Sequence, residues 1–423
     1  MMSRQGSWER RLWEDFTGDG RTVPTVALST NNGAGDAFGR LRISNAVSIF
    51  DSQLQYDKQP LLWDEQLVGS ATSTHLPNES SVEMAVTTAL GDKVIRQTKA
   101  YHRYQPGKSQ FILCTFLFGA SQSGTNKMVG YGDANNGIFL GQDGGGQYVL
   151  LRNNVLGTPS DARKIYASEW NLIYPDFAID FTKTQIFVVD LEWLGVGRVR
   201  VGVNIGGVTT YIHEFLNANN LDAVYMTTAN LPIRYEIENT TAVAASQSMK
   251  HICSTVVSEG GVEDTVAYPF STELMDVPIP LGAGNAIIIF AARPSLTFNS
   301  IENRSVFEPK GYEVVVDGGT VVTQVLYNPT IVGGTWTPYD ATVSAVEANS
   351  TVASYSGGIN VGSSIIASGN KQAVSPVFGK TVTSRLPFGI GINADTPIPL
   401  ALAAYATSTS VTASFAFQWE ELR

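Results

Sequence analysis

Short apolar and aromatic segments, each ended by glycine, asparagine or aspartate, recur about every ten residues in this chain. The series is clearest between residues 110 and 151, where turn-forming residues occupy 132–137 and 143–146. Short strands at this spacing are typical of a β-sandwich or jelly roll. Gly206 and Gly207 are placed to form another hairpin turn. No convincing long helix interrupts the pattern, so we predict an all-β protein.

Composition supports this class and excludes others. Charged residues make up 16% of the chain and glycine occurs 40 times, whereas typical soluble proteins are roughly 25% charged. The net charge is −10 and no basic run exceeds Arg10-Arg11, which argues against direct nucleic-acid binding. No apolar run approaches the roughly 18 residues of a membrane helix. The start of the chain does not resemble a signal peptide, so we expect synthesis in a cytoplasm without export.

Changes in composition divide the chain into four parts. Three prolines between residues 269 and 280 follow a glycine pair at 260–261, and such a cluster indicates a linker or crossover. Beyond it charge is sparse, with nine charged residues in the last 104. We predict an N-terminal arm (1–35), a first β-domain (36–261), a linker or crossover (262–283) and a second β-domain (284–423).

The arm contains aromatic residues but too few to make a core. Ser7 is placed to cap a short helix that ends near Phe16. Trp8, Trp13 and Phe16 are its large side chains. We expect them to dock on another surface, which makes the arm a candidate for attachment or oligomerisation.

Four charged residues lie in one expected hairpin, within residues 181–202. Alternation along a strand places Asp190 and Glu192 on one face, and Arg198 and Arg200 lie across the turn at 195–197. One interpretation is an acid and nucleophile pair like that of a retaining glycanase. The other is a ladder of cross-strand ion pairs that sets the strand register. We favour the ladder, because position 194 lacks the third acidic residue usual in sandwich-fold glycanases.

Other motifs for chemistry are weak. Asp133 begins a segment similar to a calcium loop, but its twelfth position is Gly144 instead of glutamate. A β-turn is the better interpretation, with a shallow calcium site as the alternative. The four histidines lack metal-ligand spacing, and no Gly-x-Ser-x-Gly elbow is present. The sequence therefore predicts neither catalytic residues nor a cofactor.

Several longer motifs are distributed along the chain. They are Asp36–Ser44, Phe50–Gln53, Asn135–Phe139, Thr184–Arg200, His213–Phe215, Asn219–Leu221, Pro232–Asn239, Ile252–Gly261 and Trp419–Arg423. These motifs resemble segments of structural proteins of tailed-phage particles. The resemblance covers most of the chain, with weaker agreement at 262–283 and 341–375.

This resemblance implies a lectin-like, concanavalin-like jelly roll followed by a second β-sandwich. It also implies a virion location, other virion proteins as partners and a homo-oligomer, for which analogy to virion fibres suggests a trimer. The expected role is a non-enzymatic head-fibre, decoration or tail-fibre subunit. The alternatives are a tail-fibre protein that binds a host surface glycan and, more remotely, a glycan depolymerase that uses Asp190 and Glu192.

Overall fold

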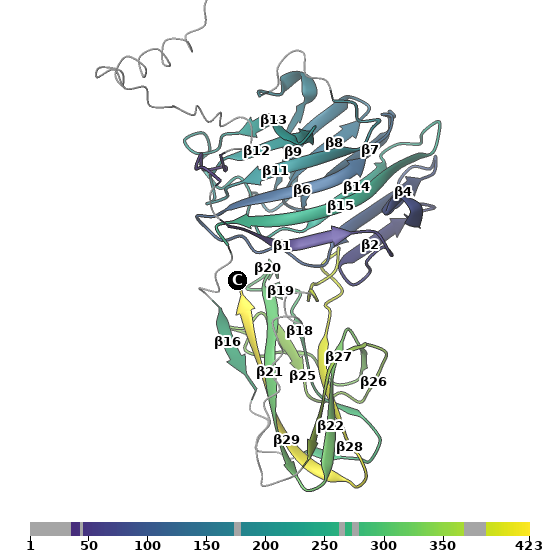
Figure 1. Ribbon diagram of the computed structural model, residues 1–423, viewed down its shortest axis with the longest axis vertical. Helices are drawn as coiled ribbons and strands as arrows, with labels where there is room; N and C mark the ends of the chain where they lie inside the picture. The colour runs from purple at the N-terminus through teal and green to yellow at the C-terminus, as the bar shows by residue number, and fades with distance from the viewer. Residues whose placement is uncertain (1–34, 43–44, 173–178, 262–266, 273–278, 368–385) are drawn as a thin grey trace, which may run out of the picture.

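The computed structural model describes residues 35–42, 45–172, 179–261, 267–272, 279–367 and 386–423, and their regular secondary structure consists almost entirely of antiparallel strands (Figure 1). Two short 3-10 turns, Pro77–Glu79 and Ala167–Glu169, are the helical segments among them. The predicted all-β class, a jelly-roll-like sandwich followed by a second sandwich, is confirmed. Within the described ranges, no helix has the length and apolarity that a membrane crossing requires.

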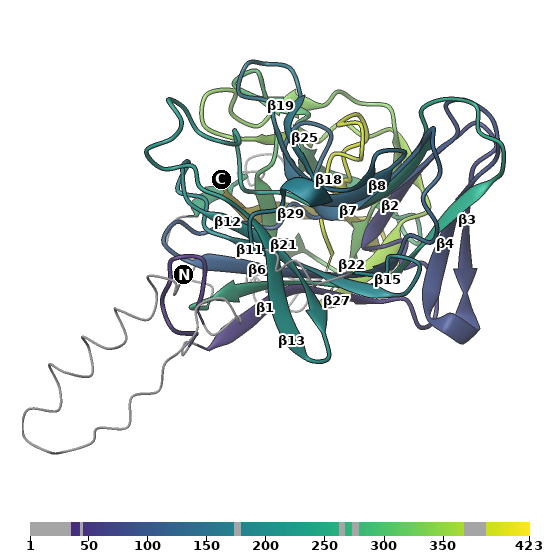
Figure 2. The ribbon, with the colours of Figure 1, turned by 90° about the horizontal axis from the view of Figure 1, so that it is seen from above.

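Two large sheets form the first sandwich (Figures 1 and 2). The first sheet has eight strands, in the order β13 (Val208–Phe215), β12 (Val199–Ile205), β11 (Gln185–Leu191), β6 (Ser109–Leu117), β15 (Gln247–Glu259), β4 (Ser81–Val86) and β3 (Thr72–Leu76), with β1 (Ala46–Gln53) also paired to β15. The second sheet has seven, in the order β10 (Ser160–Tyr166), β9 (Gly146–Asn153), β8 (Gly137–Asp143), β7 (Thr125–Gly132), β14 (Ile233–Asn239), β5 (Lys93–Thr98) and β2 (Trp63–Val68).

The tight turns lie where the sequence predicts them. Gly132 pairs with Gly137 at the end of the β7–β8 hairpin, and Asp143 pairs with Gly146 at the end of β8–β9. Ile205 pairs with Val208, so Gly206 and Gly207 alone make that turn. Both have positive φ, 61° and 81°, as a two-residue type I′ turn requires.

Alternation along the strands selects the side chains of the first core. In β6, Ile112, Cys114 and Phe116 are fully buried, whereas Leu113 and Thr115 between them are only partly covered. Val129 and Tyr235 meet them from the second sheet and belong to the same cluster. Burying each such side chain stabilises the fold by roughly 1.5–3 kcal/mol.

The second sandwich has its own core. Its larger sheet has six strands, in the order β24 (Thr337–Pro338), β25 (Val346–Asn349), β18 (Ile287–Pro294), β28 (Leu400–Ala406), β22 (Thr320–Tyr327) and β27 (Ile359–Ala367). Its four-stranded sheet contains β16 (Tyr268–Ser271), β29 (Val411–Leu422) and β17 (Ile279–Leu281), with β21 (Val306–Asp317) also paired to β29. Alternate residues of β29, among them Phe415, Phe417 and Trp419, are buried against Phe290 and Leu402. Two small two-stranded sheets are also present, β19 (Thr297–Phe298) with β20 (Ile301–Glu302) and β23 (Thr330–Val332) with β26 (Ser354–Ser356).

One sequence-based boundary differs from the structure. The stretch 262–283, expected as a linker or crossover, contributes β16 and β17, which pair with opposite ends of β29. Further along the chain, β25 starts only at Val346. Asp340 delays it, because its carboxylate accepts a hydrogen bond from the backbone N–H of Thr342 at 2.8 Å and holds a turn there.

Polar side chains join the two sandwiches. Arg304 of the second donates to the Asp133 carboxylate of the first, with Nη2 2.8 Å from Oδ2. Asn135 donates to Glu302 at 3.0 Å. The backbones of the two sandwiches also approach closely at Gly389, where an added Cβ would lie 2.4 Å from the Lys99 carbonyl oxygen.

Separate cores predict separate responses to core mutations. Trp419→Ala should cost about 3–5 kcal/mol, because it removes a large side chain and leaves a cavity. We expect hydrogen-exchange mass spectrometry to show lost amide protection in β18, β28 and β29, with β6 and β11 unchanged. Phe116→Ala is the reciprocal control. Equal loss in both sandwiches for either variant would show instead that they unfold as one unit.

Candidate functional site

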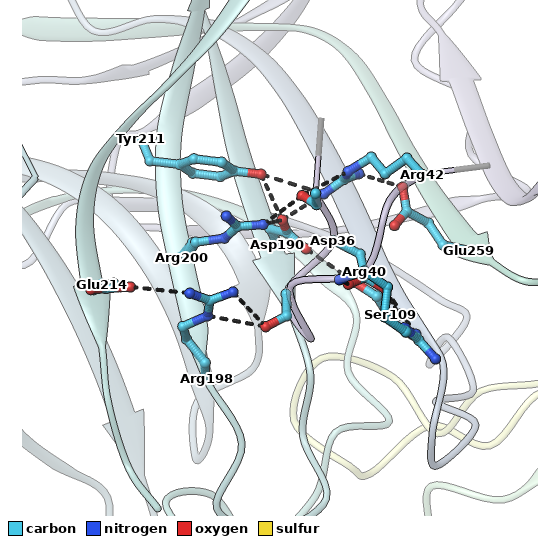
Figure 3. Close-up of polar contacts among 12 residues, drawn as sticks. Asp36, Arg40, Arg42, Ser109, Asp190, Arg198, Arg200, Tyr211, Glu214 and Glu259 are labelled. Carbon is cyan, nitrogen blue, oxygen red and sulfur yellow. Dashed lines mark hydrogen bonds and ion pairs between the residues drawn. The ribbon is translucent and has the colours of Figure 1, made fainter. Parts of the chain in front are cut away.

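A buried carboxylate, Asp190, lies at the centre of a polar cluster on the first sheet (Figure 3). Asp190 is on β11 and has no exposed surface. Its Oδ2 accepts hydrogen bonds from Arg200 Nη2 at 2.6 Å, Tyr211 OH at 2.6 Å and Arg42 Nη2 at 2.5 Å. Its Oδ1 accepts a bond from Ser109 Oγ at 3.0 Å. Two cations and two hydroxyl donors thus surround one carboxylate.

Strand register brings most of these groups together. Asp190 is directly opposite Arg200 in the β11–β12 pair. Ser109 comes from the start of β6, and Tyr211 from β13 on the far side of β12. Burial raises the pKa of Tyr211, and the adjacent Asp190 charge raises it further. The phenol therefore remains a donor to the carboxylate.

Arg42 reaches the cluster from outside the strands. It lies between Asp190 and Glu259, and forms ion pairs with both. Burial alone would lower the pKa of Arg42, but Asp190, Tyr211 and Glu259 outweigh this and raise it. Burial raises the pKa of Glu259, although Arg42 opposes the shift.

Arg198 and Arg200 hold the backbone of residues 35–42 against the sheet. Arg200 Nη2 donates to the Gly35 carbonyl at 2.7 Å. Arg198 donates to the Ala37 carbonyl through Nε at 3.0 Å and Nη2 at 2.8 Å. Within the segment, Asp36 accepts from the backbone N–H and Nε of Arg40, both at 2.8 Å. We call this set of contacts the clamp, because it attaches the segment 35–42 to the first sheet.

Only one of the two cross-strand ion pairs predicted for the hairpin is formed. Asp190 and Arg200 are opposite one another and ion-paired. Glu192, however, lies beyond the end of β11, and its Oε1 accepts the backbone N–H of Arg198 at 2.9 Å. The Arg198 guanidinium turns instead to Ala37 and lies 3.7 Å from Glu214. The loop across the turn is wider than the expected 195–197, because pairing stops at Leu191 and Val199.

This geometry does not suit a glycanase. A nucleophile must reach the sugar, yet Asp190 is sealed and all its contacts are donors of this chain. Burial raises the pKa of Glu192, as a general acid would require. A glycanase also needs a second carboxylate that reaches the substrate, and the buried Asp190 cannot supply it. The cluster is organised to hold a chain segment.

The calcium alternative at Asp133 also fails on geometry. Its Oδ1 accepts the backbone N–H groups of Asn135 and Asn136, at 2.7 and 2.8 Å. Its Oδ2 accepts both Nε and Nη2 of Arg304. A carboxylate has about four acceptor sites, so these donors use its capacity and a guanidinium occupies the cation position. Across the described ranges no group of three or more His, Cys, Asp or Glu side chains could hold a metal ion.

The residues of the Asp190 cluster only partly match those predicted from the sequence. Trp8, Trp13 and Phe16 of the arm, with the helix expected there, lie outside the described residues. Sequence reasoning did not assign Arg42, Ser109, Tyr211 or Glu259 to the cluster. No local spacing could have done so, because each lies more than 20 residues from Asp190 in the chain. Arg42 does belong to one motif of the phage resemblance, Asp36–Ser44.

Comparisons with known proteins concern the fold of about half of the chain. No protein-family model matches the sequence, and a comparison with curated proteins finds no relative. Peanut lectin is similar, with 9% identity over 51% of this chain and 98% of the lectin, at a TM-score of 0.32. The CBM2 module of the Lactobacillus casei BL23 phage J-1 evolved Dit has 5% identity over 52% of this chain and 99% of the module, at 0.34. A carbohydrate esterase from Shiga toxin-encoding bacteriophage phi24B has 10% identity over 50% of this chain and 99% of its own, at 0.31. Similarities this distant carry no function to this chain.

Removing the central charge should destabilise the first sandwich. Asp190→Asn leaves the buried Arg200 and the partly buried Arg42 around a neutral amide, which should cost about 3–5 kcal/mol. The measurement is urea denaturation of the purified protein. Asp161→Asn is the matched control, because its pair with Arg152 has a half-exposed carboxylate and should cost about 1 kcal/mol or less. Equal losses for the two variants would contradict a central role for Asp190.

Proposed function

We propose that this protein is a structural subunit of a tailed-phage particle, a projecting fibre or decoration attached through its N-terminal arm. The clamp is the observation that carries the proposal. It fastens residues 35–42 to the first sheet through Asp190, Arg198 and Arg200. Residues 1–34 therefore join the body at an anchored point, as an attachment arm must if it is to hold a projecting body.

Other features support a structural role. The ion pair between Arg304 and Asp133 connects the two sandwiches, as a projecting body of two parts requires. The polar cluster is closed instead of open to a substrate. The motifs described above resemble virion proteins across most of the chain.

The proposal includes partners and location. Other virion proteins would receive the arm, with Trp8, Trp13 and Phe16 as the contact side chains. The protein would act in the virion as a non-enzymatic homo-oligomer, without direct contact with nucleic acid or membrane.

Removing the arm separates attachment from folding. A variant that lacks residues 2–34 keeps Gly35, whose carbonyl the clamp needs. We expect unchanged circular dichroism and thermal unfolding, but loss of the protein from particles assembled in its presence, measured by quantitative mass spectrometry. The triple variant Trp8→Ala, Trp13→Ala, Phe16→Ala should show the same loss.

Tyr56→Ala is the control for the triple variant, because Tyr56 is an aromatic residue with 86% of its surface exposed in the first sandwich. It should enter particles normally. Particles that carry the arm-deleted protein at full occupancy would refute attachment through the arm.

Glycan binding is a second candidate, favoured by a cleft between the sandwiches. Its volume is about 940 Å³, in the range of small-molecule sites. Phe50, Tyr101 and Phe388 line it together with Lys99 and Arg103, and such a mixture of aromatic and polar side chains suits a saccharide. Burial lowers the pKa of Lys99.

A glycan array and host-cell binding test this candidate. Purified protein should bind at least one glycan, and Lys99→Ala should weaken that binding about tenfold by removing a charged contact. Lys183→Ala, at an exposed position away from the cleft lining, should leave it unchanged. Absence of binding to both array and cells would rule out the candidate without affecting the structural role.

A further inference from the structure

A long edge of the second sandwich has no strand beside it in the described part of the chain. β27 is the last strand of the six-stranded sheet and pairs with β22 on one side, from Thr320 opposite Ala367 to Tyr327 opposite Ile359. Its nine residues, Ile359–Ala367, include no charge and no proline. Such an edge offers unpaired backbone N–H and C=O groups to another strand.

The other edges of the four large sheets carry the usual protection against pairing. Charges lie on β1, β2, β10, β13 and β21, prolines lie on β16, β17 and β24, and the five-residue β3 is followed directly by Pro77. Charge, proline and short length each discourage strand addition. Among these described edges, β27 alone is both long and without charge or proline.

The uncharged surface continues inward from this edge. Neither β22 nor β28 contains a charged residue. Val322 of β22 is opposite Tyr405 on one side and Ile365 on the other. These three side chains form an apolar row across the sheet that ends at Ile365, which is 77% exposed. Among the described residues no strand continues the row beyond Ile365, so a strand added at this edge would extend it.

Charge favours a second copy of this chain at this edge. Each copy has a net charge of −10, so two copies repel least when they meet where charge is absent. The stretch between Glu347 and Lys371, which contains β27, has no charged residue. An uncharged strand can also pair antiparallel with itself across a two-fold axis, the commonest symmetry of homo-oligomers.

We propose that β27 pairs antiparallel with β27 of a second copy, which joins the two six-stranded sheets into one. The association rests on main-chain hydrogen bonds at the edge and on contact of the apolar rows. It needs only this chain, so it does not depend on the proposed virion role. Its two-fold symmetry differs from the trimer expected from the sequence.

Native mass spectrometry and light scattering over a concentration series test the pairing. Wild-type protein should form a dimer that dissociates on dilution. Ile365→Lys and Ser363→Lys should each raise the dissociation constant at least about tenfold, because like charges then meet across the edge. Both positions are exposed, so thermal unfolding of the monomer should remain close to wild type.

Leu156→Lys is the matched control. It places the same charge at a leucine with 90% of its surface exposed, in the turn between β9 and β10 of the other sandwich, and should leave the dissociation constant unchanged. A wild-type monomer at every concentration, a wild-type trimer, or a dimer unaffected by either β27 substitution would each overturn the proposal.

Discussion

The buried carboxylate of Asp190 is the constraint on which the first sandwich depends. An isolated charge without water is costly, so it must be surrounded by opposite charge and donors. Here Arg42, Arg200 and Tyr211 supply them. Because these groups come from an N-terminal segment and two neighbouring strands, the one requirement sets both the strand register and the path of residues 35–42.

The two sandwiches play different parts in this arrangement. The first carries the buried ion cluster and the clamp, where charge fastens a segment to a sheet. The second is poor in charge and presents β27, which has no further strand beside it in the described ranges and lies next to two uncharged strands. Arg304 and Asp133 connect them. We therefore propose an attachment point in the first sandwich and a self-association edge in the second.

Sequence reasoning worked best where the determinants are local. The turns at 132–137, 143–146 and 206–207 are confirmed, because glycine, aspartate and asparagine favour turn conformations in any fold. The same reasoning did not foresee β16 and β17 in the stretch 262–283, since prolines are tolerated at sheet edges as well as in linkers. It placed Asp190 opposite Arg200, but did not foresee that the Arg198 side chain serves the Ala37 carbonyl.

The sequence by itself determined the class of fold, because strand periodicity and turn residues act over a few positions. It also indicated that Asp190 and Arg200 could face each other, because they lie only 10 residues apart on either side of one turn. Tertiary structure alone decided what closes around Asp190, since Arg42 lies 148 residues away and is 217 residues from its other partner, Glu259. It likewise decided that Asp133 receives Arg304 instead of calcium, and that β27 is an edge. Contacts over such separations depend on how sheets stack, and no local pattern encodes that.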